Sequence, residues 1–220
     1  MKILTHVNRK NITHVGTTLR YSLYVITHPF DGFWDLTHEN RGSIAAANII
    51  ILLALLTSIF KLQFTSFLFI KVIWEYVNIF ELILGFLAPI LVGCLANWGL
   101  TTLFDGKGNM KDIYMGIGYA LTPYVLIQLP MTFISNLMTA QEGAFYYYLN
   151  TFSVIWCGLL VMCAVMMIHD FTLRKATLTL IATFVGMMLI IFVFLLFFSL
   201  VSDAVAYFVS LYKEIVFRFY

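Results

Sequence analysis

The sequence predicts an all-α integral membrane protein: a bundle of five transmembrane helices whose N-terminus lies in the cytoplasm. Three observations lead to this prediction. Of the 220 residues, 61% are hydrophobic and only 11% are charged, whereas soluble domains contain roughly 25% charged residues. The apolar residues gather into five long runs. The basic residues are divided unevenly between the segments that connect those runs.

The five apolar runs are each long enough to form a membrane-spanning helix, which needs roughly 20 residues. They are Ile44 to Phe60, Leu82 to Phe104, Ile113 to Met138, Phe145 to Ile168 and Ala176 to Val201. The links between the second and third runs and between the fourth and fifth are short, which favours antiparallel neighbours. We therefore expect one membrane domain over residues 43–201.

Two segments outside the five runs have the composition of a membrane surface. Residues 1–42 are expected to form a cytoplasmic leader with an amphipathic helix, because Leu19, Leu23, Ile26 and Phe30 recur at helical spacing among polar residues. Residues 202–220 are aromatic and charged, and are expected either to extend the fifth helix outward or to lie along the interface. Residues 64–76 are expected to form a loop or short helix that dips into the outer interface, and a sixth crossing is the alternative for this segment.

The orientation follows from the Lys and Arg residues near the runs, which concentrate on the cytoplasmic side of membrane proteins. With the N-terminus inside, nine basic residues fall on the cytoplasmic side: Lys2, Arg9, Lys10, Arg20, Arg41, Lys107, Lys111, Arg174 and Lys175. The other four fall outside: Lys61, Lys71, Lys213 and Arg218. This distribution predicts a cytoplasmic N-terminus and an outward C-terminus.

Polar residues within the runs are neutral rather than charged. Carboxylates at mid-membrane mark many ion-coupled transporters, so their absence argues against that class. Asn97, Thr122 and Gln128 have two interpretations: they hydrogen-bond between helices and fix the packing, or they line a polar path for a solute.

Small residues at four-residue spacing predict close helix contacts. They are Gly85, Pro89 and Gly93, in line with Asn97, on the second run, and Gly116 and Ala120 on the third. The two faces are expected to meet, because a tight turn joins these runs. Pro123 deprives the carbonyl of Tyr119 of its helical donor, and Asn97 is a candidate replacement.

No pattern in the sequence supports catalysis, a cofactor or a metal site. The cysteines Cys94, Cys157 and Cys163 lie in apolar runs without metal-ligand spacing, which indicates buried thiols. The turn Asp105-Gly106-Lys107-Gly108 lacks the strand and Ser/Thr of a phosphate-binding loop, and we interpret it as a capped turn. His169-Asp170 is interpreted as a solvated helix end rather than an acid–base pair.

Four motifs resemble the Ypt-interacting-protein (Yip) domain family, in its bacterial branch, over roughly residues 20 to 215. They are HPFDGFWDL (28–36), NRGSI (40–44), NWGLTTLFDGKG (97–108) and GYALTPY (118–124). The resemblance implies five spans with a cytoplasmic N-terminus. Its most specific parts are the Asn97-Trp98 pair before the Asp-Gly-Lys-Gly turn and the stretch from Gly118 to Pro123. The candidate helix-packing and motif residues are Gly93, Asn97, Trp98, Asp105, Gly106, Lys107, Gly108, Gly118, Tyr119 and Pro123.

The function expected from these observations is that of a non-catalytic membrane scaffold or accessory subunit. The resemblance implies a role beside the permeases of a carbohydrate ABC importer in the plasma membrane, since bacterial members are encoded near such permeases. Two alternatives remain: a small-solute transporter or channel, and, in a eukaryote, a Rab-associated trafficking factor of the Golgi or endoplasmic reticulum. Thr37-His38, where eukaryotic relatives have Tyr-Gly-Pro, argues against Rab binding. The expected partners are lipid and other membrane proteins, not nucleic acid.

Overall fold

The computed structural model describes residues 2–39, 41–70, 72–103 and 106–219, and within these ranges the chain is helical with no strand. The α-helices are α1 (Lys2–Thr27), α2 (Pro29–His38), α3 (Ile44–Phe64), α4 (Ile79–Leu103), α5 (Met110–Ala120), α6 (Thr122–Ile134), α7 (Gly143–His169) and α8 (Leu173–Phe219). The 3-10 turns are η1 (Trp74–Tyr76) and η2 (Ala140–Glu142). Among the described residues, five helical stretches are long and apolar enough to span a membrane, counting α5 and α6 as one. The predicted all-α, five-span fold is confirmed.

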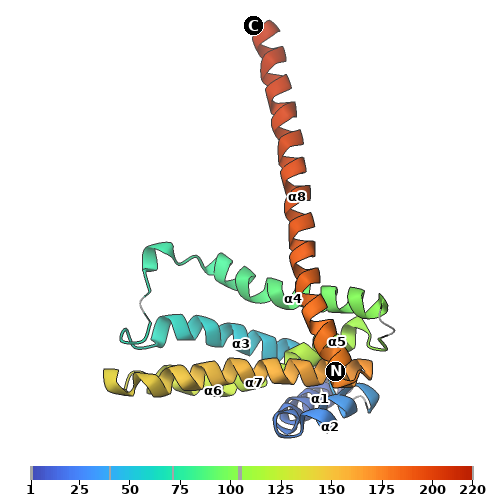
Figure 1. Cartoon of the computed structure of the whole chain (residues 1–220), viewed down its shortest axis with the longest axis vertical. Coiled ribbons are helices and arrows are strands. Elements are labelled where there is room, and N and C mark those ends of the chain that lie inside the picture. Colours follow the sequence, from blue (N-terminus) through green and yellow to red (C-terminus); the bar gives the residue numbers. More distant parts are fainter. Residues whose placement is uncertain (1, 40, 71, 104–105, 220) are drawn as a thin grey trace.

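The helices other than α8 form a bundle in which α3, α6 and α7 run side by side (Figure 1). Its core includes Ala46 and Ala47 of α3, Tyr119 of α5 and Leu160 of α7. The hairpin of α1 and α2 packs against one end of this bundle, where α2 contacts α7. The described residues between α3 and α4 contain turns and η1, and they form no helix long enough to span a membrane.

The third predicted span is broken into α5 and α6 at Leu121. Pro123 sits in the first turn of α6, where a missing backbone N–H is tolerated. The carbonyl of Tyr119 accepts a hydrogen bond from the Thr122 hydroxyl at 2.7 Å. The expectation that Asn97 satisfies this carbonyl is therefore wrong, because the Thr122 side chain at the start of α6 reaches it. Asn97 instead bonds to Thr183 and His169.

Helix α3 begins at Ile44, where the first predicted span begins. Ser43 is its N-cap, and the Ser43 hydroxyl accepts a hydrogen bond from the backbone N–H of Ala46 at 3.1 Å. The helix continues to Phe64, four residues beyond the predicted end, and Lys61 lies in its last turn. There Lys61 Nζ donates to Asn150 Oδ1 of α7 at 2.8 Å, so the basic residue is accommodated by a partner helix.

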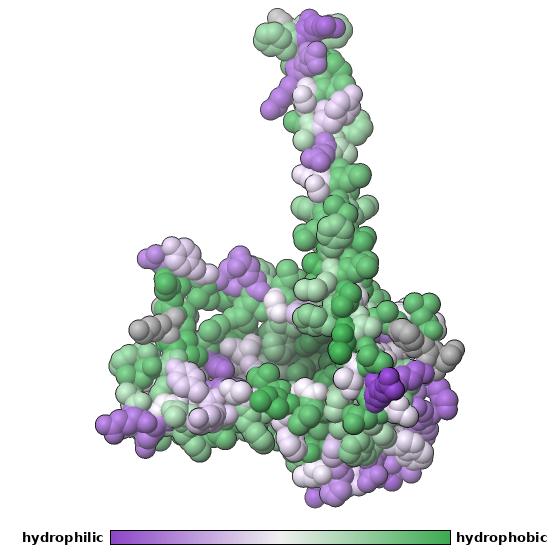
Figure 2. Space-filling model, viewed as in Figure 1, coloured by the Kyte–Doolittle hydropathy of each residue, from purple (hydrophilic) through white to green (hydrophobic). Residues whose placement is uncertain are grey.

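Helix α8 leaves the bundle as a single long rod (Figure 1). It has 47 residues and continues through the tail that follows the fifth predicted span. Its first part crosses α4, where Gly186 lies against Leu100 and Ala96. Beyond that crossing its side chains are exposed, and Figure 2 shows hydrophobic residues around the shaft with hydrophilic residues toward the far end.

Candidate functional site

Three buried polar side chains connect α4, α7 and α8. The ring nitrogen Nε2 of His169 donates to Asn97 Oδ1 at 3.2 Å, and Asn97 Nδ2 donates to Thr183 Oγ1 at 3.0 Å. All three side chains are buried, with His169 only 1% exposed. We call this group the polar junction. It joins three membrane helices through hydrogen bonds that lipid cannot replace.

The turn that contains Gly106 and Gly108, just before α5, covers the polar junction. The backbone N–H of Gly108 donates to His169 Nδ1 at 3.2 Å, so Nδ1 is the unprotonated nitrogen and Nε2 carries the hydrogen. A Cβ on Gly106 would lie 2.8 Å from His169 Nδ1, and one on Gly108 would lie 2.7 Å from His169 Cε1. Side chains at either glycine would therefore collide with the imidazole. Asp105 lies outside the described residues.

An ion pair on the surface fastens the same turn to the end of α7. Lys107 Nζ lies 2.8 Å from Asp170 Oδ2, and this hydrogen bond lowers the pKa of the Asp170 carboxyl below its ordinary value. Asp170 caps α7 in the left-handed conformation, with φ of 54° and ψ of 40°. Asp tolerates this region better than most residues, so the backbone there turns sharply and directs the carboxylate toward Lys107.

His169 is the residue that sequence reasoning misjudged. The interpretation of His169-Asp170 as a solvated helix end is correct for Asp170, which is exposed, but wrong for His169. The imidazole is buried because it fills the space under the Gly106–Gly108 turn. Two features of the sequence could have indicated this burial. A histidine ends a predicted helix, and a turn elsewhere in the chain has two glycines, which leave room for a bulky side chain.

The predicted small-residue faces do not pair with each other. A Cβ on Gly93 would meet Met187 of α8 at 3.6 Å, whereas a Cβ on Gly116 would approach Ile168 and Ala164 of α7. The expectation that the α4 face meets the α5 face is therefore wrong, because α8 and α7 fill those positions. Trp98, next to the polar junction in sequence, points outward and is 44% exposed.

Gly118 and Tyr119 join the bundle to the N-terminal hairpin. A Cβ on Gly118 would lie 2.8 Å from the Cβ of Ala47, so α5 and α3 touch closely there. The fully buried Tyr119 hydroxyl donates to the Thr18 carbonyl at 3.2 Å and accepts from the Ser43 backbone N–H at 3.3 Å. One side chain thus fixes α1 and the start of α3 to the bundle.

The three residues of the proposed polar path make separate contacts. Asn97 belongs to the polar junction, and the Thr122 hydroxyl donates to the Tyr119 carbonyl near the end of α5. Gln128 Nε2 donates to Ser153 Oγ of α7 at 2.6 Å. These contacts match the packing interpretation of the three residues.

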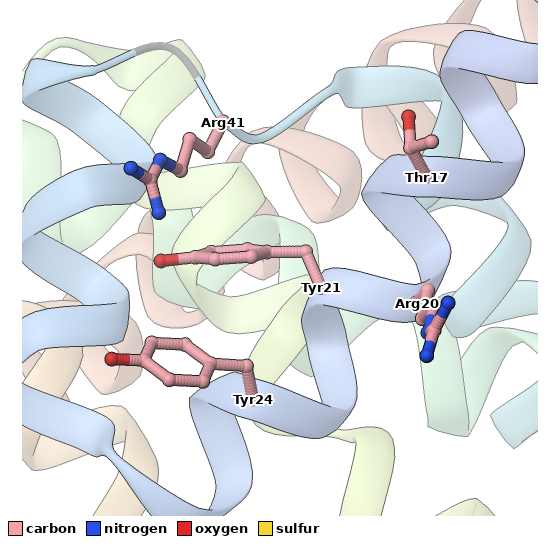
Figure 3. Close-up of a pocket in the computed structure, with 5 residues that line it drawn as sticks. All are labelled: Thr17, Arg20, Tyr21, Tyr24 and Arg41. Atoms are coloured by element: carbon pink, nitrogen blue, oxygen red, sulfur yellow. The ribbon is translucent and has the colours of Figure 1, made fainter.

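The N-terminal hairpin carries an open pocket of about 350 Å³ lined by Thr17, Arg20, Tyr21, Tyr24 and Arg41. Figure 3 shows the two tyrosine rings and Arg41 on one side of α1, with Arg20 directed away from them. The Arg41 guanidinium is already paired with Glu39 at 2.6 Å and Asp35 at 3.2 Å. Its charge is therefore compensated, and the pocket is a poor site for an anion.

Five membrane-length helices, linked by buried polar contacts and a glycine turn, define a polytopic helical membrane protein. The family model of the Yip1 domain matches residues 23–206, so the chain belongs to the Yip1 domain family. Searches among curated proteins and among solved structures gave no match. The expectation of a Yip-type domain is confirmed.

Proposed function

We propose that this protein is a non-catalytic scaffold or accessory subunit that binds another integral membrane protein. The observation that supports this is the exposure of α8. None of the residues in its most apolar stretch of 18 is buried, compared with 39% of the corresponding stretch in α3 and in α7. Beyond the crossing with α4, the helix therefore leaves its whole circumference available to a partner.

The length of α8 suits this role. A helix of 47 residues is about 70 Å long, while the hydrocarbon core is about 30 Å thick. The charged residues Asp203, Lys213, Glu214 and Arg218 lie within residues 203–219, at the end of α8. We infer that α8 both crosses the membrane and projects from it, so a partner can be held within and outside the bilayer.

A non-catalytic role is supported by the state of the buried His169 side chain. Both ring nitrogens of His169 are occupied by structural hydrogen bonds to Asn97 and Gly108. A general acid or base needs a nitrogen free to exchange a proton with substrate. The polar junction is thus suited to holding helices in place.

The partner class that we propose is the permease pair of a carbohydrate ABC importer in the plasma membrane. Its support is the resemblance to bacterial Yip-domain proteins together with the unpartnered helix α8. In a eukaryotic cell the same docking helix would act in the Golgi or endoplasmic reticulum.

Affinity purification of the tagged full-length protein from membranes, in a mild detergent, tests this proposal. Permease subunits are expected at a fixed stoichiometry. The double variant Phe194→Ala and Phe197→Ala on α8 should lose them. Phe133→Ala with Phe145→Ala, which also changes two exposed phenylalanines, should retain them. Recovery of the chain alone, without any crosslinked neighbour, contradicts the proposal, as does equal loss in both double variants.

A further inference from the structure

A small cavity lies between four helices beside the polar junction. Its volume is about 180 Å³, and its lining residues are Gly93, Asn97, Ile117, Val161, Val165, Leu180, Thr183, Phe184 and Met187. These residues come from α4, α5, α7 and α8. One water molecule takes up about 30 Å³ in the liquid, so the cavity has room for roughly six groups of the size of a water molecule or a methylene.

The cavity is suited to an apolar occupant. Its two polar lining residues already satisfy each other, because Asn97 donates to Thr183 and the Thr183 hydroxyl donates to the Thr179 carbonyl at 2.7 Å. Asn97 Oδ1 also accepts from His169. The remaining lining residues are glycine and hydrophobic side chains. A polar solute would find few free hydrogen-bonding groups there.

Cationic side chains lie at one end of this cavity's wall. Lys175 Nζ sits 4.2 Å from the centre of the Phe171 ring. Phe171 packs in a cluster with Val165 and Leu180, and these two residues also line the cavity. Packed side chains therefore connect Lys175 to the cavity wall.

The positive charge at this end is not neutralised within the described part of the chain. Arg174 and Lys175 are exposed, and neither forms an ion pair with a described carboxylate. Asp170, the acidic residue near them in sequence, is engaged by Lys107. This surface therefore favours an anionic group.

We propose that this region is a binding site for an anionic phospholipid, with the end of one acyl chain in the cavity and its phosphate beside Arg174 and Lys175. The spacing along α8 fits such a molecule. Lys175 and Met187 are separated by 12 residues of continuous helix, which corresponds to about 18 Å. An extended acyl chain of a phospholipid covers a similar length, so a phosphate beside Lys175 allows the end of the chain to reach Met187.

Photocrosslinking of the full-length protein in liposomes tests this site. The probe is phosphatidylglycerol with a diazirine near the end of one acyl chain, and labelled peptides are identified by mass spectrometry. Labels are expected on the cavity-lining segments of α4, α7 and α8. Phosphatidylcholine with the same chain should label them less, and Arg174→Gln with Lys175→Gln should remove the difference between the two lipids.

Cavity-filling variants provide the decisive comparison. Gly93→Leu should reduce labelling roughly tenfold, because a side chain then occupies the space of the acyl chain. Gly85→Leu is the control on the same helix, because a Cβ at position 85 would meet nothing within 4 Å. This variant should not reduce labelling. A second pair keeps the test valid if Gly93→Leu fails to fold: Val161→Phe fills the cavity, whereas the exposed Val154→Phe does not.

Two results would overturn the proposal. The first is equal labelling in the filled variants and their controls, which is the behaviour of lipid that merely surrounds the helices. The second is equal labelling by the two headgroups in the unmodified protein, which would remove the role of Arg174 and Lys175.

Discussion

His169 Nε2 lies 3.2 Å from Asn97 Oδ1, and this buried hydrogen bond joins the end of α7 to the last third of α4. The same imidazole accepts from the Gly108 backbone. One side chain therefore couples two membrane helices to the turn between α4 and α5. The family-motif residues Asn97 and Gly108 meet at a histidine that lies outside those motifs.

Replacing Asn97 with leucine, which has nearly the same shape, should destabilise the protein by about 1–2 kcal/mol. The His169 N–H and the Thr183 hydroxyl would each lose a partner in a buried site. Because the three free cysteines are buried, reaction with a thiol-reactive dye during heating reports unfolding. Thr102→Val, at an exposed position of α4, is the control and should change little.

The double variant Asn97→Leu with His169→Phe tests the assignment further. If the two side chains stabilise the protein through their mutual bond, the combined loss is smaller than the sum of the single losses. Strict additivity would show that the contact contributes nothing.

Gly118→Ala should destabilise the protein by about 1–3 kcal/mol, because the added methyl would press on Ala47 of α3. Gly99→Ala is the matched control, since it also changes a helical glycine but one with open space around it. Alanine favours helix over glycine by about 1 kcal/mol, so the control should be neutral or more stable. Thermal unfolding of the two variants in parallel decides between close packing and a general glycine effect.

The spans and their order could be predicted from the sequence because hydrophobic run length depends on the bilayer and not on tertiary contacts. The sequence could not predict which neighbouring helix each small-residue face touches. The small residues of α4 and α5 indicated close approach, but spacing alone does not distinguish α8 from α5 as the neighbour of Gly93. His169 was missed for a similar reason: its burial depends on a turn 61 residues earlier in the chain.

Tyr119→Phe should loosen the N-terminal hairpin while leaving the membrane helices folded. The phenol bridges the Thr18 carbonyl and the Ser43 N–H, and its loss leaves both groups without this partner. Limited proteolysis is expected to cut α1 and α2 faster in this variant. Tyr148→Phe, which alters a tyrosine that is 75% exposed, should be cut at the normal rate. Unchanged protection in Tyr119→Phe would mean that apolar packing alone holds the hairpin.

At Asp170, glycine should be tolerated better than alanine, by about 1 kcal/mol, because the backbone is left-handed there. Asp170→Asn removes only the charge, because asparagine tolerates the left-handed conformation as aspartate does. The folded-state pKa of Asp170 is lowered by Lys107, so the ion pair stabilises the protein above the ordinary carboxyl pKa of about 3.9. This contribution is lost as the pH falls through the lowered value.

Unfolding measured at pH 7 and near pH 3 should therefore show the difference between Asp170→Asn and the unmodified protein shrinking in acid. High salt should shrink it too, since both partners are exposed. A difference that persists under both conditions would point to the backbone geometry instead of the charge.

The cytoplasmic position of the N-terminus is a prediction that labelling can test. If it is correct, the turn before α5 lies inside and the 3-10 turn η2 lies outside. Lys111→Cys and Gln141→Cys place single thiols at exposed positions in these two places, and the native cysteines are buried. An impermeant maleimide added to intact cells should label Gln141→Cys at once and Lys111→Cys only after permeabilisation. The reverse pattern would invert the topology, and with it the side of the membrane on which Arg174 and Lys175 meet lipid.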